Sequence, residues 1–170
     1  MQNIHTERLL LSQFAATDAA FIFELLNTPT WIQFIGERNI NTLEDAENYI
    51  VQKLMPSYIE NGFGFFAVKL KENNVPIGMC GFIKREGLDE VDIGFAFLPL
   101  YTGKGYAFEA AHASLIHAKD ELKITNLLAI TTKENEHSIR LLEKLGLVFE
   151  KNVYIPGDPE ELMLFRKIVS

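Results

Sequence analysis

Two glycines that flank a lysine, Gly103-Lys104-Gly105, stand where the sequence changes from a strand pattern to a helix pattern. The run before them, Val91–Leu98, is apolar and rich in β-forming residues, and Pro99 closes it. The run after them, Phe108–Ile116, is rich in alanine and has helical periodicity. A glycine turn at the start of a helix leaves backbone N–H groups unpaired, and with the positive end of the helix dipole they bind phosphate. The pattern therefore predicts a site for a phosphorylated ligand.

The spacing around this turn excludes two common phosphate-binding motifs. A P-loop requires serine or threonine directly after the lysine, and Gly105 stands there. A dinucleotide-binding fingerprint requires a third glycine three residues after the second, and Phe108 holds that position. An isolated Gly-x-Gly is also typical of an ordinary turn with a helix cap. The rest of the chain must therefore identify the ligand.

Composition narrows the class of protein. The 170 residues are 48% apolar and 23% charged, which is typical of one globular domain spanning residues 1–170. The formal net charge of −7 argues against binding to nucleic acid or to an anionic membrane. No apolar run approaches the length of about 18 residues that a membrane span needs.

The cysteine and histidine content predicts neither a disulfide nor a metal site. Cys80 is the only cysteine, which fits a reducing cytoplasm, and the first residues lack the pattern of an export signal. Cys80 lies in a strand pattern, where a small buried hydrophobic residue is expected rather than a catalytic thiol. His112 and His117 are five residues apart and do not share a helix face.

Periodicity and turn signals predict an α+β domain with the element order β-α-α-β-β-β-α-β-α-β-β. Strands are expected over Arg8–Gln13, Phe63–Leu70, Val75–Arg85, Glu90–Leu98, Asn126–Thr132, Leu147–Ile155 and Glu161–Ile168. Helices are expected from a cap at Thr17 or Asp18 to about Asn27, from a capping box at Thr42 to before Gly62 with a kink at Pro56, after Gly105, and over Glu136–Leu145 with Gly146 ending it. Thr28–Ile40 is expected to be a loop.

The connections predict a mixed sheet. Short turns join the three strands between Phe63 and Leu98, so these strands should form an antiparallel meander. A helical crossover separates Glu90–Leu98 from Asn126–Thr132, so this pair should be parallel.

Four stretches of the chain, in this order and spacing, carry a family resemblance. They are Thr6–Leu11, Pro76–Gly78 leading into Asp92–Phe95, Thr102–Ala107 with Glu109-Ala110, and Asn135 with Ser138–Gly146. Together they resemble the GNAT superfamily of acetyl-CoA-dependent N-acetyltransferases, in its RimJ/RimL-like branch. The chain departs from the family at Thr102, where glutamine or arginine is usual. The resemblance implies a mixed, mostly antiparallel seven-stranded sheet with about four helices, in which the two parallel strands splay apart.

The resemblance also implies acetyl-CoA as the co-substrate, with no metal. The turn would hold the diphosphate through Gly103, Lys104, Gly105, Tyr106 and Ala107. The pantetheine arm would lie between the splayed strands, against the backbone of Phe95, Ala96, Phe97 and Leu98. A backbone N–H of this strand would stabilise the oxyanion, and further coenzyme contacts would come from Asn135 and Ser138.

The chemistry requires a base and benefits from an acid, because an amine must be neutral to attack a thioester. Asp92 stands where relatives often carry glutamate and is the candidate base; its alternative role is to pair with a neighbouring strand residue. Ser138 resembles the serine that protonates the leaving thiolate in the RimJ/RimL-like branch. Its alternative role is local, at the third position of a helix capped by Asn135. Alternative proton donors are Tyr101, Tyr106 and Tyr154.

The acceptor side is expected in the Thr28–Ile40 loop, because the corresponding loop of relatives overhangs the groove. Trp31, Phe34 and Arg38 could shape the acceptor pocket, with Arg38 meeting a substrate carboxylate. Trp31 and Phe34 could equally anchor the loop to the core.

The main hypothesis is an enzyme that transfers acetyl from acetyl-CoA to a primary amine, a protein N-terminus or a small amine, by direct attack in a ternary complex. A sensor that binds acyl-CoA without turnover, and an interaction domain whose turn is empty, are the alternatives. The expected partners are acetyl-CoA and the amine, without nucleic acid or membrane, and a homodimer, common in the family, stays open.

Overall fold

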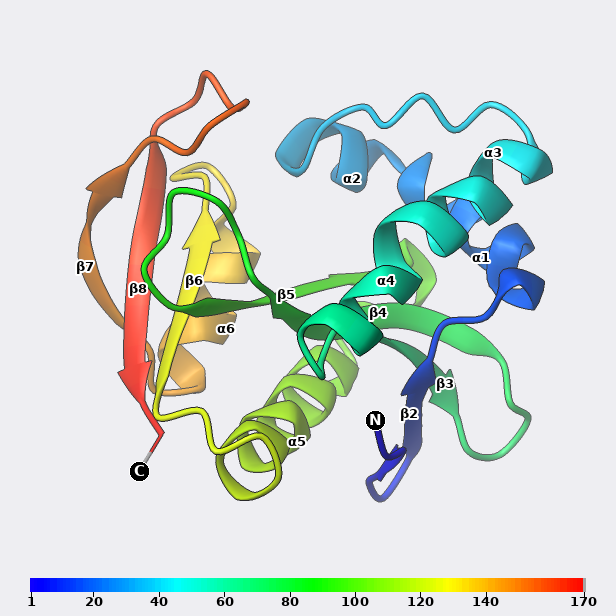
Figure 1. Ribbon diagram of the computed structural model, residues 1–170, viewed down its shortest axis with the longest axis horizontal. Coiled ribbons are helices and arrows are strands. Elements are labelled where there is room, and N and C mark those ends of the chain that lie inside the picture. Colours follow the sequence, from blue (N-terminus) through cyan, green and yellow to red (C-terminus); the bar gives the residue numbers. More distant parts are fainter. Residues whose placement is uncertain (170) are drawn as a thin grey trace.

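One mixed sheet of eight strands, in the order β1-β2-β3-β4-β5-β6-β8-β7, organises the molecule (Figure 1). The computed structural model describes residues 1–169. The strands are β1 (Ile4–His5), β2 (Leu9–Gln13), β3 (Phe65–Leu70), β4 (Pro76–Ile83), β5 (Val91–Phe97), β6 (Asn126–Thr131), β7 (Val148–Val153) and β8 (Leu162–Ile168). The α-helices are α1 (Ala19–Leu26), α2 (Pro29–Phe34), α3 (Leu43–Tyr49), α4 (Met55–Glu60), α5 (Tyr106–Asp120) and α6 (Glu136–Lys144).

The predicted α+β class and mixed sheet are confirmed. Strands β3, β4 and β5 form the expected antiparallel meander, and β5 runs parallel to β6. The eighth strand, beyond the seven expected, is the short β1, which pairs with β2. The hairpin partner β8 lies between β6 and β7, a placement that local sequence signals do not specify.

The parallel pair separates soon after it forms. Strands β5 and β6 are paired only at Val91 with Leu127 and at Asp92 with Leu128. Beyond Asp92, β5 continues along β4 to Phe97 without pairing to β6. In Figure 1 the strands β6, β8 and β7 stand upright while β4 and β5 run across the picture. The sheet therefore has an opening between the carboxyl halves of β5 and β6.

The segment predicted as a loop over Thr28–Ile40 contains helix α2, so that part of the prediction is wrong. The Thr28 side chain accepts a hydrogen bond from the Trp31 N–H at 3.3 Å, and Pro29 is the first helical residue. A threonine cap followed by proline is a helix-start signal, because proline lacks the N–H that the first turn leaves unused. Trp31 becomes buried as a result.

The long helical segment after Thr42 is continuous, with a π-helical turn between α3 and α4. Thr42 and Asp45 form the predicted capping box, in which the Asp45 N–H donates to the Thr42 Oγ1 at 3.0 Å. The π-helical turn η2 (Ile50–Leu54) links α3 to α4 directly before Pro56. Proline has no N–H for the ladder and its ring crowds the preceding turn, which accounts for the widening there.

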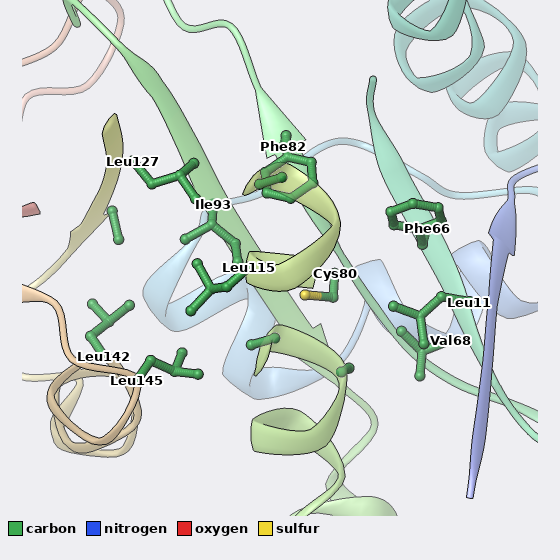
Figure 2. Packing of buried hydrophobic residues seen from close by; sticks show 14 of the residues in the cluster. Leu11, Phe66, Val68, Cys80, Phe82, Ile93, Leu115, Leu127, Leu142 and Leu145 are labelled. Atoms are coloured by element: carbon green, nitrogen blue, oxygen red, sulfur yellow. The ribbon is translucent and has the colours of Figure 1, made fainter. Parts of the chain in front are cut away.

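Helices cover both faces of the sheet, and each face has its own hydrophobic core (Figure 1). On one face α5 and α6 cover the strands. Figure 2 shows Leu115 of α5 near Ile93 and Cys80; Leu142 contributes from α6, and Leu145 from the cap directly after it. This core fixes α5 beneath β4 and β5, and so fixes where its N-terminus lies.

On the opposite face α1, α2 and α3 enclose the second core. The two cores share strands because successive side chains point to opposite faces. In β3, Phe66 and Val68 belong to the core under α5, whereas Ala67 belongs to the core under α1. In β5, Ala96 contacts the second core, so Gly94 and Asp92, two and four residues earlier, face the same side. Within residues 1–169 no helix is both long and apolar enough to cross a bilayer.

Burial of His117 on α5 should make stability depend on pH. The residue is 8% exposed, and its ring meets the edge of Phe66 with centroids 5.8 Å apart. Burial lowers the pKa of His117, which Glu121 partly opposes, so the unfolded chain binds the proton more readily. The stability that comes from this shift in the His117 pKa is present above the unfolded pKa of about 6.5 and is lost as pH falls below it.

We therefore expect H117N to flatten the fall in melting temperature between about pH 7 and about pH 5. The exposed His112 on the same helix provides the control variant H112N, which should follow the unaltered protein. Equal pH dependence in all three proteins would contradict the assignment to His117.

Candidate functional site

The glycine turn before α5 has the geometry that its sequence predicts. The short 3₁₀ turn η3 (Pro99–Tyr101) follows β5, and an exposed stretch leads to Tyr106, the first residue of α5. Gly103 has a φ of +74° and Gly105 a φ of +83°. Residues with a side chain rarely adopt these values, so both positions require glycine for backbone conformation. At Gly103 no atom lies within 4 Å of an added Cβ, so space is not the reason there.

The turn presents free donors at the positive end of the helix. The first hydrogen bond into α5 runs from the Glu109 N–H to the Gly105 carbonyl at 3.0 Å. Among residues 1–169, no acceptor is hydrogen-bonded to the backbone N–H groups from Gly103 to Phe108. Gly105 is the N-cap residue of α5 and has no side chain that could accept hydrogen bonds from these N–H groups. This end of α5 can therefore bind an anion.

The open edge of β5 supplies main-chain groups beside the turn. The Leu98 N–H donates to the Ile77 carbonyl on the β4 side at 2.9 Å. Main-chain groups of successive strand residues point to opposite edges, so those of Ala96 also face β4, whereas those of Phe95 and Phe97 face the opening toward β6. An extended ligand in the opening can pair with Phe95 and Phe97.

A groove of about 1020 Å³ runs through this opening and brings most of the predicted site residues together. Those that line it are Trp31, Phe34, Arg38, Asp92, Phe95, Ala96, Phe97, Asn135 and Ser138. Leu98 and the turn from Gly103 to Ala107 are not part of its lining. The Leu98 side chain is buried in the core under α1.

Asp92 is buried in an ion pair at the groove. Its side chain is 1% exposed, and its Oδ2 lies 3.4 Å from the Arg85 Nη2. Burial raises the pKa of Asp92, and the Arg85 charge opposes this shift. The Asp92 Oδ1 and the Arg85 Nε are buried without a hydrogen-bond partner in the described part of the chain. The carboxylate is therefore less accessible than a base in direct contact with substrate would be.

Sequence reasoning missed Arg85 as a site residue, although the hairpin register contains the signal. Ile83 is the cross-strand partner of Asp92, and Arg85 lies two residues beyond Ile83. Residues at this diagonal offset lie on one face and within reach of long side chains. Reading the register of the β4–β5 hairpin would have paired Arg85 with Asp92.

Tyr49 is a second residue that the sequence did not assign to the site. It lines the same groove as Arg38 and Arg85. Burial raises the pKa of Tyr49, while the nearby Arg38 and Arg85 charges lower it. The groove wall under α2 and α3 thus combines two guanidinium groups with a phenol.

Asn135 and Ser138 start helix α6 as the local interpretation predicted. The Asn135 Oδ1 accepts a hydrogen bond from the Ser138 backbone N–H at 3.2 Å, which caps the helix. The Ser138 side chain is half-buried at the groove. The cap uses the backbone of Ser138, so its hydroxyl remains available for another role.

The alternative tyrosine donors lie outside the groove lining. Tyr154 is exposed and its hydroxyl donates to Glu161 at 3.2 Å, and this contact raises the pKa of Tyr154. Tyr101 and Tyr106 lie beside each other near the glycine turn, with ring centroids 6.5 Å apart.

Cys80 is a core residue, as predicted. It is fully buried, and burial raises its pKa to about 12. Its Sγ lies 3.6 Å from the Ser114 Oγ. A thiol in this state is no nucleophile. Residues 1–169 contain no cluster of acidic, histidine and cysteine side chains that could hold a metal ion.

Residues 8–148 match the acetyltransferase (GNAT) domain family. The match covers well over half of the chain, so the protein belongs to the GNAT acetyltransferases, and the resemblance read from the four motif stretches is confirmed at the level of the GNAT family.

Relatives and solved structures agree with this family. An uncharacterized N-acetyltransferase of Bacillus subtilis (strain 168), YnaD, is 32% identical over 145 residues, which cover 85% of this chain and 82% of YnaD. The crystal structure of a GNAT-family acetyltransferase from Bacillus anthracis has a TM-score of 0.82 at 29% identity and covers 99% of each chain. The microcin C7 self immunity acetyltransferase MccE, solved in complex with acetyl-CoA and AMP, has a TM-score of 0.81 at 18% identity over 96% of this chain and 93% of its own. At that identity MccE shows a common fold alone.

Two variants separate the cap of α6 from the hydroxyl beside it. We expect N135A to lower the free energy of unfolding by about 1 kcal/mol, because it removes the side chain that accepts the Ser138 N–H. S138A keeps that N–H and the cap, so it should leave stability within about 0.5 kcal/mol of the unaltered protein. Urea unfolding measures both, and an equal loss in the two variants would contradict this division.

Proposed function

We propose that the protein transfers the acetyl group of acetyl-CoA to a primary amine by direct attack in a ternary complex. The observation that carries this proposal is the set of unpaired N–H groups from Gly103 to Phe108 beside the open edge of β5. With this arrangement a ligand can place a diphosphate on the N–H groups of the turn and an extended, amide-bearing arm along the open edge of β5. Acetyl-CoA has both parts, and MccE, which has the same fold, holds acetyl-CoA in its crystal structure.

In this proposal the coenzyme is bound mainly by backbone. Gly103, Lys104, Gly105, Tyr106 and Ala107 bind the diphosphate. Phe95 and Phe97 pair with the amides of the pantetheine arm, because their main-chain groups face the opening. The thioester then lies near Asp92 and Ser138, which line the same groove.

The proposed reaction needs no covalent enzyme intermediate. The amine nitrogen attacks the acetyl carbonyl carbon, the carbon–sulfur bond breaks, and the oxyanion accepts a hydrogen bond from the β5 backbone. The proton from the amine passes to Asp92 through a water molecule, because the carboxylate is buried behind the groove surface. The Ser138 hydroxyl donates the proton that the leaving thiolate takes, and Ser138 regains a proton from the protonated Asp92 through water, which restores both groups.

The acceptor proposed is a protein N-terminus or a small amine, as in the RimJ/RimL-like branch that the motif stretches resemble. Trp31 and Phe34 are proposed to shape its pocket from α2, and Arg38 to meet a carboxylate near the amine. Support comes from Arg38, Arg85 and Tyr49, whose positive and hydrogen-bonding groups share one wall of the groove. A cytoplasmic location, expected from the single cysteine, is part of the same proposal.

Coenzyme binding is tested first. CoA at about 100 times its dissociation constant should stabilise the protein by about 2.7 kcal/mol, which differential scanning fluorimetry detects as a higher melting temperature. An unchanged melting temperature at millimolar CoA would leave the turn without its proposed ligand.

Turnover is tested next, with an acceptor found by screening amino acids, peptides, polyamines and aminoglycosides for release of free CoA. We expect D92N to lower kcat about 100-fold and S138A at least about 10-fold, because each removes a proton-transfer group. The dissociation constant for CoA should be unchanged in D92N, since the diphosphate turn is intact. Full activity of D92N would make Asp92 a structural partner of Arg85. Tight CoA binding without turnover on any acceptor would favour the acyl-CoA sensor.

A further inference from the structure

The N-terminal segment is fastened to the first turn of α5 through one carboxylate. The Thr6 Oγ1 donates to the Glu109 Oε1 at 2.6 Å, and the Arg8 backbone N–H donates to the same oxygen at 2.9 Å. The Arg8 Nε donates to the other oxygen, Oε2, at 2.7 Å. Both Glu109 oxygens are thus occupied by residues about a hundred positions away in the chain.

Arg8 also contacts the glycine turn itself. Its Nη1 donates to the Lys104 carbonyl at 3.0 Å, and its guanidinium carbon lies 4.3 Å from the centre of the Tyr106 ring. Its Nη2 lies 3.3 Å from where a Cβ on Gly105 would be. One side chain therefore touches the turn before, at and after Gly105.

The bond to the Lys104 carbonyl determines where a donor points. The Lys104 carbonyl and the Gly105 N–H belong to one planar trans peptide unit, so they point in opposite directions. Because Arg8 holds the carbonyl on its own side, the Gly105 N–H points away from Arg8. In the free turn, with two residues at positive φ, nothing else among residues 1–169 bonds this peptide unit.

Arg8 also compensates a charge. Glu109 lies in the first turn of α5, where a carboxylate is attracted to the positive helix end. Burial would raise the pKa of Glu109, but hydrogen bonds from Thr6 and Arg8 lower it below the usual value, so it is ionised at neutral pH. An uncompensated carboxylate here would repel an anion that binds the same helix end. The Arg8 guanidinium neutralises it at 2.7 Å.

We propose that Arg8 is a positioning residue for the coenzyme diphosphate: it orients the Lys104–Gly105 peptide and neutralises Glu109, so that the free N–H groups of the turn face the ligand. The inference rests on the proposed function of the turn as the diphosphate site. It extends the coenzyme site to Arg8, which lies between β1 and β2. Arg8 does not line the groove, and it is far from the glycine turn in the sequence.

The experiment measures the dissociation constant for CoA by isothermal titration calorimetry on the full chain, with melting temperatures recorded in parallel. The variants are R8A, R8K, E109Q and R8A/E109Q. E109Q is suited to the purpose because the glutamine Oε1 can still accept hydrogen bonds from the Thr6 hydroxyl and the Arg8 backbone N–H, while the negative charge is removed. The control is R166A, which removes an arginine on β8 that likewise pairs with carboxylates, those of Glu150 and Asp89.

We expect R8A to weaken CoA binding at least about 10-fold and R166A to leave it unchanged. R8K should be intermediate, because lysine restores the charge but does not hold Glu109 and the Lys104 carbonyl together. R8A/E109Q should bind CoA more tightly than R8A, because the repelling carboxylate is gone. A role limited to fastening the N-terminus would not give this rescue, since E109Q adds no contact that replaces those lost with the Arg8 side chain.

Each outcome bears on the inference. CoA binding by R8A as tight as by the unaltered protein would overturn it, and so would R8A/E109Q binding no tighter than R8A. These results leave the proposed function standing, because the unaltered protein still binds CoA. Failure of the unaltered protein to bind CoA would instead overturn the proposed function, and this inference with it.

Discussion

The early separation of β5 from β6 is the constraint on which the rest of the site depends. A strand in the middle of a sheet normally uses its main-chain groups on both edges, and beyond Asp92 one edge of β5 is released. That release creates the groove and leaves the donors and acceptors of Phe95 and Phe97 facing it. Helices α5 and α6 pack on one face of the sheet and α1 to α3 on the other, and both cores include contacts with β4 and β5. The groove is therefore a property of the packing of the entire sheet.

Two carboxylates lie near the proposed site, Asp92 in the groove lining and Glu109 in the first turn of α5. Each is paired with an arginine from another part of the chain. Asp92 on β5 pairs with Arg85 beyond β4, and Glu109 on α5 pairs with Arg8 before β2. The two pairs differ in burial: the Asp92 side chain is 1% exposed and that of Glu109 18%, while Arg85 is 32% exposed and Arg8 42%. Solvent screens the Arg8–Glu109 pair, so its main effect is on geometry and local charge rather than on stability. The buried Asp92 has no such screening; burial raises its pKa, and the Arg85 charge opposes that shift.

Local signals were sufficient for most of the fold. The capping box at Thr42, the asparagine cap at Asn135 and the glycine that ends α6 all act within a few residues, so their sequence patterns predicted the helix boundaries closely. The same kind of signal was present at Thr28 and Pro29 but was overlooked, which is why α2 was expected to be a loop. The two-residue strand β1 is too short for a periodic pattern, and only its pairing with β2 defines it.

The sequence by itself determined the glycine turn, the parallel relation of β5 and β6, and the order of the elements other than β1 and α2, because each depends on residues close together in the chain or on the length of one connection. Only the tertiary structure decided which side chains meet across the sheet. The contacts of Arg8 with Glu109 and Lys104 span about a hundred residues, and β8, inserted between β6 and β7, buries Phe165 in the core under α5 and α6. Such contacts are selected by the summed burial and hydrogen bonding of distant elements, which no short stretch of sequence contains.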